Sequence, residues 1–412
     1  MTAPLDLESL ADIGLSPTQL FPLKDQLAEC QALIDDPIHP MRVVEVQRDH
    51  VLLHDGHHTH RASPSNALQA ALQAQFDALA VGDWVLARLR SADNWQAVEL
   101  LPRHSQVSRR TNDGRGGVQR QVLVANVNSA LLVMGLDHDF NLRRLERYLM
   151  LVQLAGIGAV LVLTKADCVD AAATDQRLAA ARALLPTDVP CLAVDGRDPS
   201  TAQRLGEWLP RGATVVLLGS SGAGKSTLTN TLLAAHGVPG PAEPSATAAA
   251  MVTDSAVPRC RVTPAQVTRQ RSDNHHATGA VRQDDSRGRH TTTHRSLHCT
   301  PGGACIIDTP GLRALRLDID SRDDLAGAFG DVERAASGCR FRDCRHQSEP
   351  GCAVREAIEP ERLRNFQKLL REAQRDSRSA LERIEQVAQW KVRHRAALTR
   401  MRVKRGAEAD RG

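Results

Sequence analysis

Residues 219–226 have the spacing G-x-x-x-x-G-K-[ST] of a phosphate-binding loop, reading Gly-Ser-Ser-Gly-Ala-Gly-Lys-Ser. An apolar, strand-like run at 213–218 precedes them, and a stretch typical of a helix follows to about Ala235. In such a loop the glycines let backbone N–H groups turn toward phosphate oxygens, beside the positive end of a helix. A chance match in a Gly/Ser-rich turn is the alternative, and the flanking strand and helix favour a nucleoside triphosphate site instead.

The residues of this loop are expected to divide by role. Lys225 would reach the β- and γ-phosphates, where it serves both binding and hydrolysis, and Ser226 would hold Mg²⁺. The other expected phosphate contacts are Gly219, Ser220, Ser221, Gly222, Ala223, Gly224 and Thr227.

A second element, Thr164-Lys165-Ala166-Asp167, follows another apolar run at 159–164. It resembles the [NT]-K-x-D sequence with which GTPases read guanine. A carboxylate at Asp167 can accept hydrogen bonds from the N1–H and the 2-amino group of guanine, whereas adenine has an acceptor at N1 and no such amino group. Lys165 can pack its stem along the base. Because this tetrapeptide is common by chance, its place after a strand is what makes Thr164, Lys165 and Asp167 candidate guanine-binding residues.

Residues 286–293 read Ser-Arg-Gly-Arg-His-Thr-Thr-Thr. A threonine in a loop after the phosphate-loop helix commonly completes the coordination of Mg²⁺ and reports on the γ-phosphate. We expect Thr292 to have this role, with Thr291 and Thr293 as the alternatives. A Ser/Thr-rich loop without a role is the competing interpretation.

An apolar run at 304–307 leads into Asp308-Thr309-Pro310-Gly311, a D-x-x-G element. Asp308 is expected to hold Mg²⁺ through water, and the Gly311 N–H to meet the γ-phosphate. The next residue is Leu312, where many GTPases carry a glutamine that orients the attacking water. Since leucine cannot orient water, we expect His290 to be the catalytic group, in a protein whose turnover is slow until a partner orders this loop.

Cys339, Cys344, His346 and Cys352 place three thiols and one imidazole within 14 residues. Cys₃His is a standard tetrahedral set for structural zinc, and four protein ligands leave no position open for catalysis. We therefore expect this zinc to fold a C-terminal domain.

The other cysteines, in a total of nine, do not form a disulfide framework and indicate reduced thiols in a cytoplasm. A second possible metal site is the histidine group His54, His57, His58 and His60, at a predicted hairpin turn. A simply solvated turn is the alternative.

The elements that position these residues change along the chain. Short β-type runs between about 41 and 102 suggest a small barrel of the OB-fold type. Such barrels often bind RNA, and Phe76, Trp84 and Trp95 are the aromatic residues that could stack on bases. Contacts between arginines and RNA are favoured over stacking, and the candidates are Arg88, Arg90, Arg103, Arg109 and Arg110. A purely structural barrel is the alternative.

Strand-like and helical runs alternate from near Arg120 onward and predict a parallel sheet covered on both faces. Ligands of such a sheet lie at the carboxyl ends of its strands. The expected strands are 122–127, 130–136, 159–164, 190–194, 213–218 and 304–307, and the expected helices are 142–155, 171–185 and 201–209.

Charge and hydropathy exclude some functions. The net charge is only +4, so a nucleic-acid site must come from local patches such as the basic run 391–405. No apolar run reaches the length of a membrane span, and the N-terminus lacks a signal peptide, so we expect no membrane contact.

The order of the motifs is unusual, because the guanine element comes before the phosphate loop and the D-x-x-G element. This circular permutation, the run Asp-Phe-Asn-Leu-Arg-Arg-Leu-Glu-Arg-Tyr at 139–148, and the Gly-Arg-His-Thr-Thr-Thr run at 288–293 resemble the ribosome-small-subunit-dependent GTPase A family, called RsgA or YjeQ. The resemblance runs from about residue 40 to 375. Two departures stand out: Asp195-Gly196 occupies a guanine loop that commonly reads Ser-Ala, and the insertion at 237–280 is long.

The resemblance implies an OB-fold barrel, a permuted P-loop GTPase domain of the α/β class and a helical zinc-binding domain. We place an N-terminal extension at 1–36, the barrel at 37–105, the GTPase domain at 106–320, the zinc domain at 321–385 and a basic tail at 386–412. It also implies GTP hydrolysis in the late maturation of the small ribosomal subunit, with the subunit and its rRNA as partners of a monomer. A metallochaperone GTPase, or an RNA-binding module with a structural nucleotide, are the alternatives.

Overall fold

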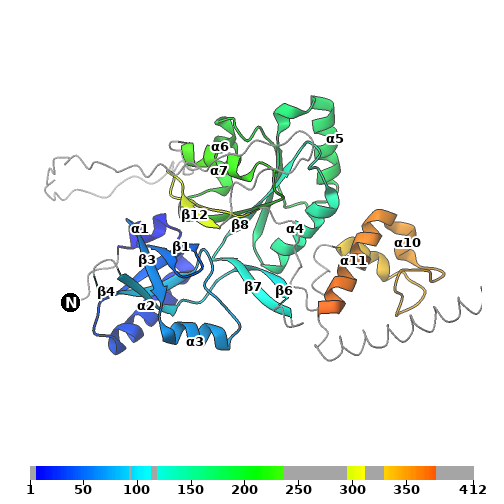
Figure 1. Ribbon diagram of the computed structural model, residues 1–412. Helices are drawn as coiled ribbons and strands as arrows, with labels where there is room; N and C mark the ends of the chain where they lie inside the picture. The colour runs from blue at the N-terminus through cyan, green and yellow to red at the C-terminus, as the bar shows by residue number, and fades with distance from the viewer. Residues whose placement is uncertain (1–5, 92–93, 113–117, 236–294, 311–328, 377–412) are drawn as a thin grey trace, which may run out of the picture.

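The computed structural model describes residues 6–91, 94–112, 118–235, 295–310 and 329–376 of the chain (Figure 1). A β-barrel, an α/β unit and a small helical unit follow one another along the described chain. His290, Thr291, Thr292, Thr293 and Gly311 lie outside the described residues.

Five strands close into the N-terminal barrel in the order β1-β2-β3-β5-β4, with β4 pairing back onto β1. The strands are β1 (Ile38–Val46), β2 (Val51–His54), β3 (Thr59–Pro64), β4 (Trp84–Ser91) and β5 (Asn94–Leu100). Only the β3–β5 pair is parallel, and helix α3 (Asn66–Ala74) connects β3 to β4. Leu68 and Leu72 of α3 join the apolar side chains of the strands in the barrel core. The predicted OB-type barrel is confirmed.

The N-terminal extension is helical and belongs to the barrel's packing. It forms α1 (Leu7–Asp12) and α2 (Pro17–Leu33), with Ser16 capping α2. Leu10 and Leu23 are buried together with Trp84, whose side chain is 0% exposed. The prediction that Trp84 could stack on bases was therefore wrong, because this ring fills the space between the extension and the barrel.

Arg103 is also structural. Its guanidinium donates to Asp83 at 2.6 Å through Nε and to Asp77 at 2.7 Å through Nη1. The Asp83 carboxylate is buried, so removing its cation would leave a buried charge without compensation. The expected contact of Arg103 with RNA phosphate was wrong for this reason.

The central sheet has the order β10-β9-β8-β11-β13, all parallel, with β12 (Ser296–Cys299) added antiparallel to β13. Its parallel strands are β8 (Ser129–Gly135), β9 (Gly158–Thr164), β10 (Cys191–Ala193), β11 (Thr214–Gly219) and β13 (Cys305–Asp308). Beyond β12 the sheet continues into the barrel, because Glu45 of β1 pairs with Ser296. The strands of the barrel and of the central unit thus belong to one continuous hydrogen-bonded sheet.

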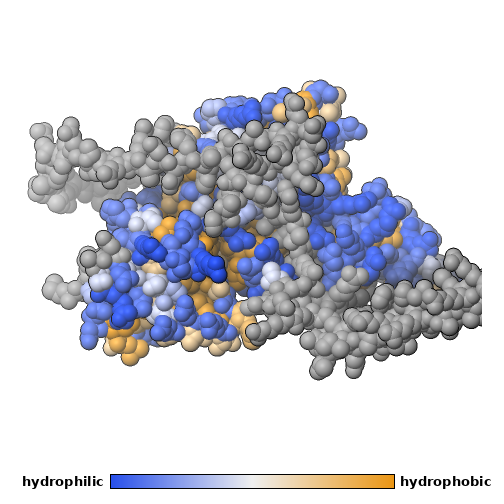
Figure 2. Space-filling model, viewed as in Figure 1, coloured by the Kyte–Doolittle hydropathy of each residue, from blue (hydrophilic) through white to orange (hydrophobic). Residues whose placement is uncertain are grey.

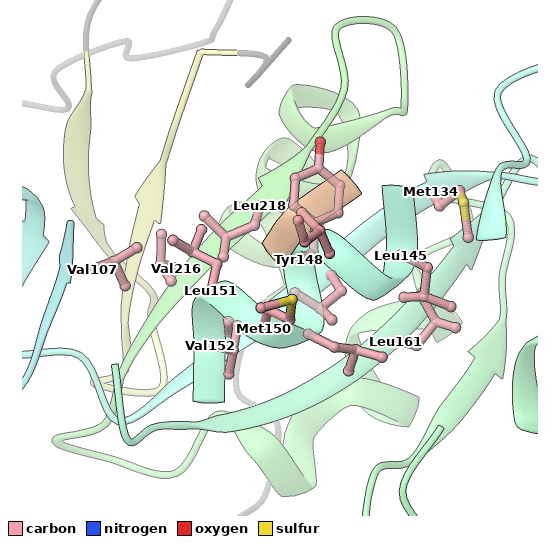
Figure 3. Packing of buried hydrophobic residues seen from close by; sticks show 14 of the residues in the cluster. Val107, Met134, Leu145, Tyr148, Met150, Leu151, Val152, Leu161, Val216 and Leu218 are labelled. Carbon is pink, nitrogen blue, oxygen red and sulfur yellow. The ribbon is translucent and has the colours of Figure 1, made fainter. Parts of the chain in front are cut away.

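Two apolar layers sandwich this sheet, as its fully buried strands require. On one face, Val216 and Leu218 pack with Tyr148 and Leu151 of α4 (Leu142–Leu154), as Figure 3 shows. Helix α5 (Ala171–Arg182) adds to the same layer. The alternate residues of β11 face the other layer, formed by α6 (Ser200–Leu205) and α7 (Lys225–Ala234). The predicted doubly covered parallel sheet is confirmed.

One predicted strand of the sheet lies elsewhere. Residues 122–127 were expected in the parallel sheet, but β7 (Val118–Ala125) pairs antiparallel with β6 (Gln106–Asn112) in a separate two-stranded ribbon. Only residues 126–128 separate β7 from β8, whereas parallel neighbours need a crossover of about a dozen residues. The ribbon instead inserts Val107 beside Val216 and Leu151 (Figure 3).

A buried guanidinium joins the extension, the barrel and the central unit. Arg42 of β1 is 0% exposed and donates to the carbonyl oxygens of Ile13, Asn126 and Gly82. It also lies over the Trp84 ring, 5.6 Å from the ring centroid. These partners compensate the burial of a charge that is otherwise costly to remove from water.

The C-terminal unit packs against α4. It consists of α9 (Gly330–Ala336), α10 (Ala353–Ala357) and α11 (Pro360–Asp376). Glu146 of α4 is buried and accepts hydrogen bonds from Arg362 and Asn365 of α11. The outer side of these helices is mainly hydrophilic (Figure 2).

Candidate functional site

The phosphate loop has the backbone that its glycines predict. Gly222 and Gly224 have φ of 84° and 91°, in the left-handed region that disfavours side chains. Gly219 is needed for a different reason, because a Cβ there would lie 2.3 Å from the carbonyl oxygen of Val133. Helix α7 begins directly after Gly224, so its N-terminus faces the loop.

Lys225 folds over this loop. Its Nζ donates to the carbonyl oxygens of Ser220 at 2.7 Å and Gly219 at 3.1 Å, and the side chain is buried. Burial lowers the pKa of Lys225 to about 8, while the charges of Asp308 and Asp139 act in the opposite direction. The ammonium group therefore carries its charge at neutral pH beside the backbone that would receive phosphate.

The two residues expected to hold Mg²⁺ lie side by side, the hydroxyl of Ser226 next to the carboxylate of Asp308. Ser226 Oγ donates to Asp308 Oδ2 at 3.1 Å, and Asp308 is buried at the end of β13. Thr309 fixes the start of the D-x-x-G element through a 2.6 Å hydrogen bond from its hydroxyl to Leu217 O. A hydroxyl and a carboxylate are the hard oxygen ligands that Mg²⁺ prefers, so the residues present fit this ion.

The guanine element contacts the phosphate loop directly. Thr164, 1% exposed, donates from Oγ1 to Ala223 O at 2.6 Å. Lys165 has a left-handed backbone with φ 61°, and its Nζ lies 2.8 Å from Asp137 Oδ2. Asp167 is exposed in the short 3₁₀ turn η1 (Ala166–Cys168) that follows β9. The guanine element, the phosphate loop and the D-x-x-G element, which are out of their usual order along the chain, therefore meet at one edge of the sheet.

Sequence reasoning did not single out Asp139 as part of the site. Its carboxylate accepts hydrogen bonds from Ser220 Oγ at 2.6 Å and from the Gly135 N–H at 3.1 Å. Arg144 of α4 forms an ion pair with the same group at 2.9 Å. Asp139 thus anchors the start of the phosphate loop to the end of β8. An available signal was a carboxylate two residues before Asn141, which caps α4 at the carboxyl edge of the sheet.

The loop with the unusual Asp195-Gly196 pair lies beside helix α7 and the predicted guanine element. Thr231 of α7 donates from Oγ1 to Gly196 O at 2.7 Å, and the Ala166 N–H donates to Val194 O at 3.2 Å. The loop therefore occupies the position next to the guanine element even though its residues depart from Ser-Ala.

The side chains of the cysteine cluster lie close enough together to bind one metal ion. The ligand atoms of Cys339, Cys344, His346 and Cys352 all lie within 4.8 Å of one another. The Sγ atoms of Cys339 and Cys352 are 3.9 Å apart, and His346 Nδ1 lies 3.7 and 3.5 Å from them. Tetrahedral zinc with Zn–S bonds of about 2.3 Å would separate two sulfurs by about 3.8 Å. The cluster is therefore compatible with one zinc ion, held by His346 through Nδ1.

The N-terminal histidine group is held by hydrogen bonds instead. His60 Nε2 lies 2.8 Å from Asp55 Oδ2, and His57 Nε2 lies 3.1 Å from Asp6 Oδ2. Within the part of the chain that the structure describes, potential metal ligands gather closely only at the C-terminal cysteine cluster.

The fold and these contacts define a circularly permuted GTPase. A family model described as RsgA GTPase matches residues 100–318, and the chain belongs to this family of GTP-hydrolysing enzymes. Its members act on guanine nucleotide with Mg²⁺. None of the described helices is long and apolar enough to cross a bilayer.

Relatives and solved structures agree with this assignment. A "Small ribosomal subunit biogenesis GTPase RsgA" from Xanthomonas oryzae pv. oryzae (strain MAFF 311018) is 40% identical over 346 residues, covering 80% of this chain and 79% of the relative. The protein of the same description from Xanthomonas axonopodis pv. citri (strain 306) is 40% identical over 359 residues and covers 84% of both.

Two solved structures share the fold. YjeQ from Thermotoga maritima has a TM-score of 0.52 at 19% identity, covering 82% of this chain and 98% of that one. YloQ, described as a circularly permuted GTPase, has a TM-score of 0.50 at 18% identity, covering 83% and 97%.

Proposed function

We propose that this GTPase acts in the late maturation of the small ribosomal subunit and that the subunit stimulates its hydrolysis of GTP. The observation that carries the proposal is the convergence of the permuted motifs, through the Thr164–Ala223 and Ser226–Asp308 hydrogen bonds. The names of the Xanthomonas relatives supply the ribosomal context.

The site residues are proposed to divide the work as follows. Asp167 reads guanine, with Thr164 and Lys165 placing the loop, and the loop residues 219–227 bind the phosphates. Ser226 and Asp308 hold Mg²⁺, together with Thr292 or one of its neighbours Thr291 and Thr293. Lys225 stabilises charge on the β- and γ-phosphates, which is the main way that proteins accelerate phosphoryl transfer.

His290 is proposed to orient the attacking water, since Leu312 occupies the usual position of glutamine. The N–H of Gly311 is proposed to meet the γ-phosphate. His290 precedes β12, whose first residue, Ser296, pairs with Asp308. Gly311 follows Asp308, the last residue of β13. The zinc site is proposed to be structural, because four protein ligands leave no open position.

The surfaces proposed to bind rRNA are the barrel, the C-terminal helices and the basic tail 386–412. The run 391–405 contains seven Lys and Arg residues and no acidic residue. Such density suits phosphate backbones. We also propose that the protein works in the cytoplasm as a monomer.

The deciding experiment measures GTP turnover with purified small subunits, with large subunits as the matched control. The expected result is stimulation by the small subunit alone. The Asp167→Asn variant should lose this activity because it loses the acceptor for guanine, while His290→Ala should bind GTP normally and turn over slowly even with subunits. If small subunits leave turnover unchanged, the ribosomal proposal fails and the GTPase assignment stands.

A further inference from the structure

Two cysteines of the central sheet lie opposite each other on neighbouring strands. Cys299 of β12 and Cys305 of β13 are register partners in the antiparallel ladder, and their sulfur atoms are 3.8 Å apart. Neither belongs to the cluster of potential zinc ligands. The nucleotide site does not use them.

The backbone at this pair favours a bond between the side chains. The N–H of Cys305 donates to Ala213 O at 2.7 Å, on the side of the strand that faces β11. Cys305 therefore meets β12 as a non-hydrogen-bonded residue, and the Cα atoms of such pairs lie about 4.5 Å apart. This separation falls within the range of about 4.4–6.8 Å found in disulfides, so rotation of the two side chains suffices to join the sulfurs.

The surroundings favour a thiolate on one sulfur and give an oxidant access to the other. The hydrogen bond from Cys299 and the nearby guanidinium of Arg42 lower the pKa of Cys305, whose side chain is fully buried. Cys299 is exposed. The hydrogen bond with Cys305 and burial raise the pKa of the Cys299 thiol, so the proton between the two sulfurs lies on Cys299. A residue exposed at the surface next to a buried, charge-stabilised partner is the arrangement of a redox pair.

We propose that Cys299 and Cys305 form a reversible cross-strand disulfide when the protein meets a hydroperoxide. The proton of the S–H···S hydrogen bond moves to Cys305, and the Cys299 thiolate attacks one oxygen of hydrogen peroxide, so that an S–O bond forms, the O–O bond breaks and a sulfenic acid and hydroxide result. The Cys305 thiolate then attacks this sulfur, so that the S–S bond forms, the S–O bond breaks and hydroxide leaves with the proton that Cys305 released. The two thiols are oxidised by two electrons in total, the peroxide is reduced, and a dithiol restores both thiols.

The position of this pair places the disulfide in the strand hairpin that ends beside the magnesium site. Asp308 lies three residues after Cys305, and it pairs with Ser296 at the other end of the same ladder. Because cytoplasmic disulfides are usually transient and redox-sensing, a reversible link at this place is chemically consistent with a reducing compartment.

The test is peptide mapping of the full-length protein after brief treatment with hydrogen peroxide. Unreacted thiols are alkylated with iodoacetamide in denaturant before digestion with trypsin. Both cysteines fall in the single tryptic peptide 296–313. The expected product is this peptide with two hydrogen atoms fewer and without alkylation, and dithiothreitol before alkylation should restore two modified cysteines.

Two serine variants make the outcome decisive. In Cys299→Ser the peptide should lose the two-hydrogen product, whereas Cys168→Ser, which removes another exposed thiol, should leave it unchanged. Recovery of the peptide with both cysteines alkylated, at a dose of peroxide that oxidises Cys168, would overturn the proposal. So would a disulfide that links either cysteine to a different partner.

Discussion

The pKa of Lys225 leads to a prediction about the pH dependence of nucleotide affinity. Burial lowers this pKa to about 8, and anionic phosphates beside Nζ would raise it again. Binding therefore takes up a proton above pH 8. The affinity is fully present below pH 8 and falls as the pH rises through that value, because the free protein loses the ammonium charge. Linkage gives a decrease of about tenfold in GTP affinity between pH 7 and pH 9.

The assay is a fluorescence titration with a labelled GTP analogue at several pH values between 7 and 9, at constant Mg²⁺ and ionic strength. Lys225→Arg is the matched control, since a guanidinium stays charged over this range. Titration of the guanine base and the phosphates affects both proteins equally, so the ratio of their affinities isolates Lys225. A ratio that stays constant from pH 7 to pH 9 would refute the reasoning.

Three further predictions concern stability and folding. Thr164→Val removes the donor to the buried Ala223 carbonyl and should lower the free energy of unfolding by about 2 kcal/mol in chemical denaturation, whereas Thr164→Ser should remain close to the parent. Leu23→Ala should cost about 2–5 kcal/mol, because this fully buried side chain packs the extension onto the barrel; a loss below 1 kcal/mol would mean that the extension is dispensable. Cys352→Ser, or prolonged chelation of the parent, should abolish the bound zinc and expose the C-terminal helices to limited proteolysis, and full zinc content in Cys352→Ser would contradict the ligand set.

The sequence predicted the parts of the site whose chemistry demands particular residue types at fixed spacing. The phosphate loop needs Gly219 because a side chain would collide with Val133 O, and this constraint is visible as a motif. The four potential zinc ligands were also predictable, because they lie close together in the chain. The parallel sheet followed from apolar runs that alternate with helices.

The rest depended on contacts between residues far apart in the sequence. Asp139 accepts a hydrogen bond from Ser220, which lies 81 positions further along the chain. The residues around each of them do not indicate that the two side chains meet. The strand at 122–127 has the apolar character of a sheet strand, yet the short connection to β8 forces it into the antiparallel ribbon. Trp84 resembled a base-stacking residue only because the weakly patterned extension that buries it gave no sign of packing there.

The pairing of Glu45 with Ser296 has a mechanical consequence. It makes the first barrel strand a neighbour of the strand that pairs with Asp308, and Arg42 clamps the same junction from inside. Force applied to the barrel by a large bound assembly would be transmitted through the backbone pairing of β1, β12 and β13 toward Asp308. A displacement of the barrel would then be coupled to the position of Asp308.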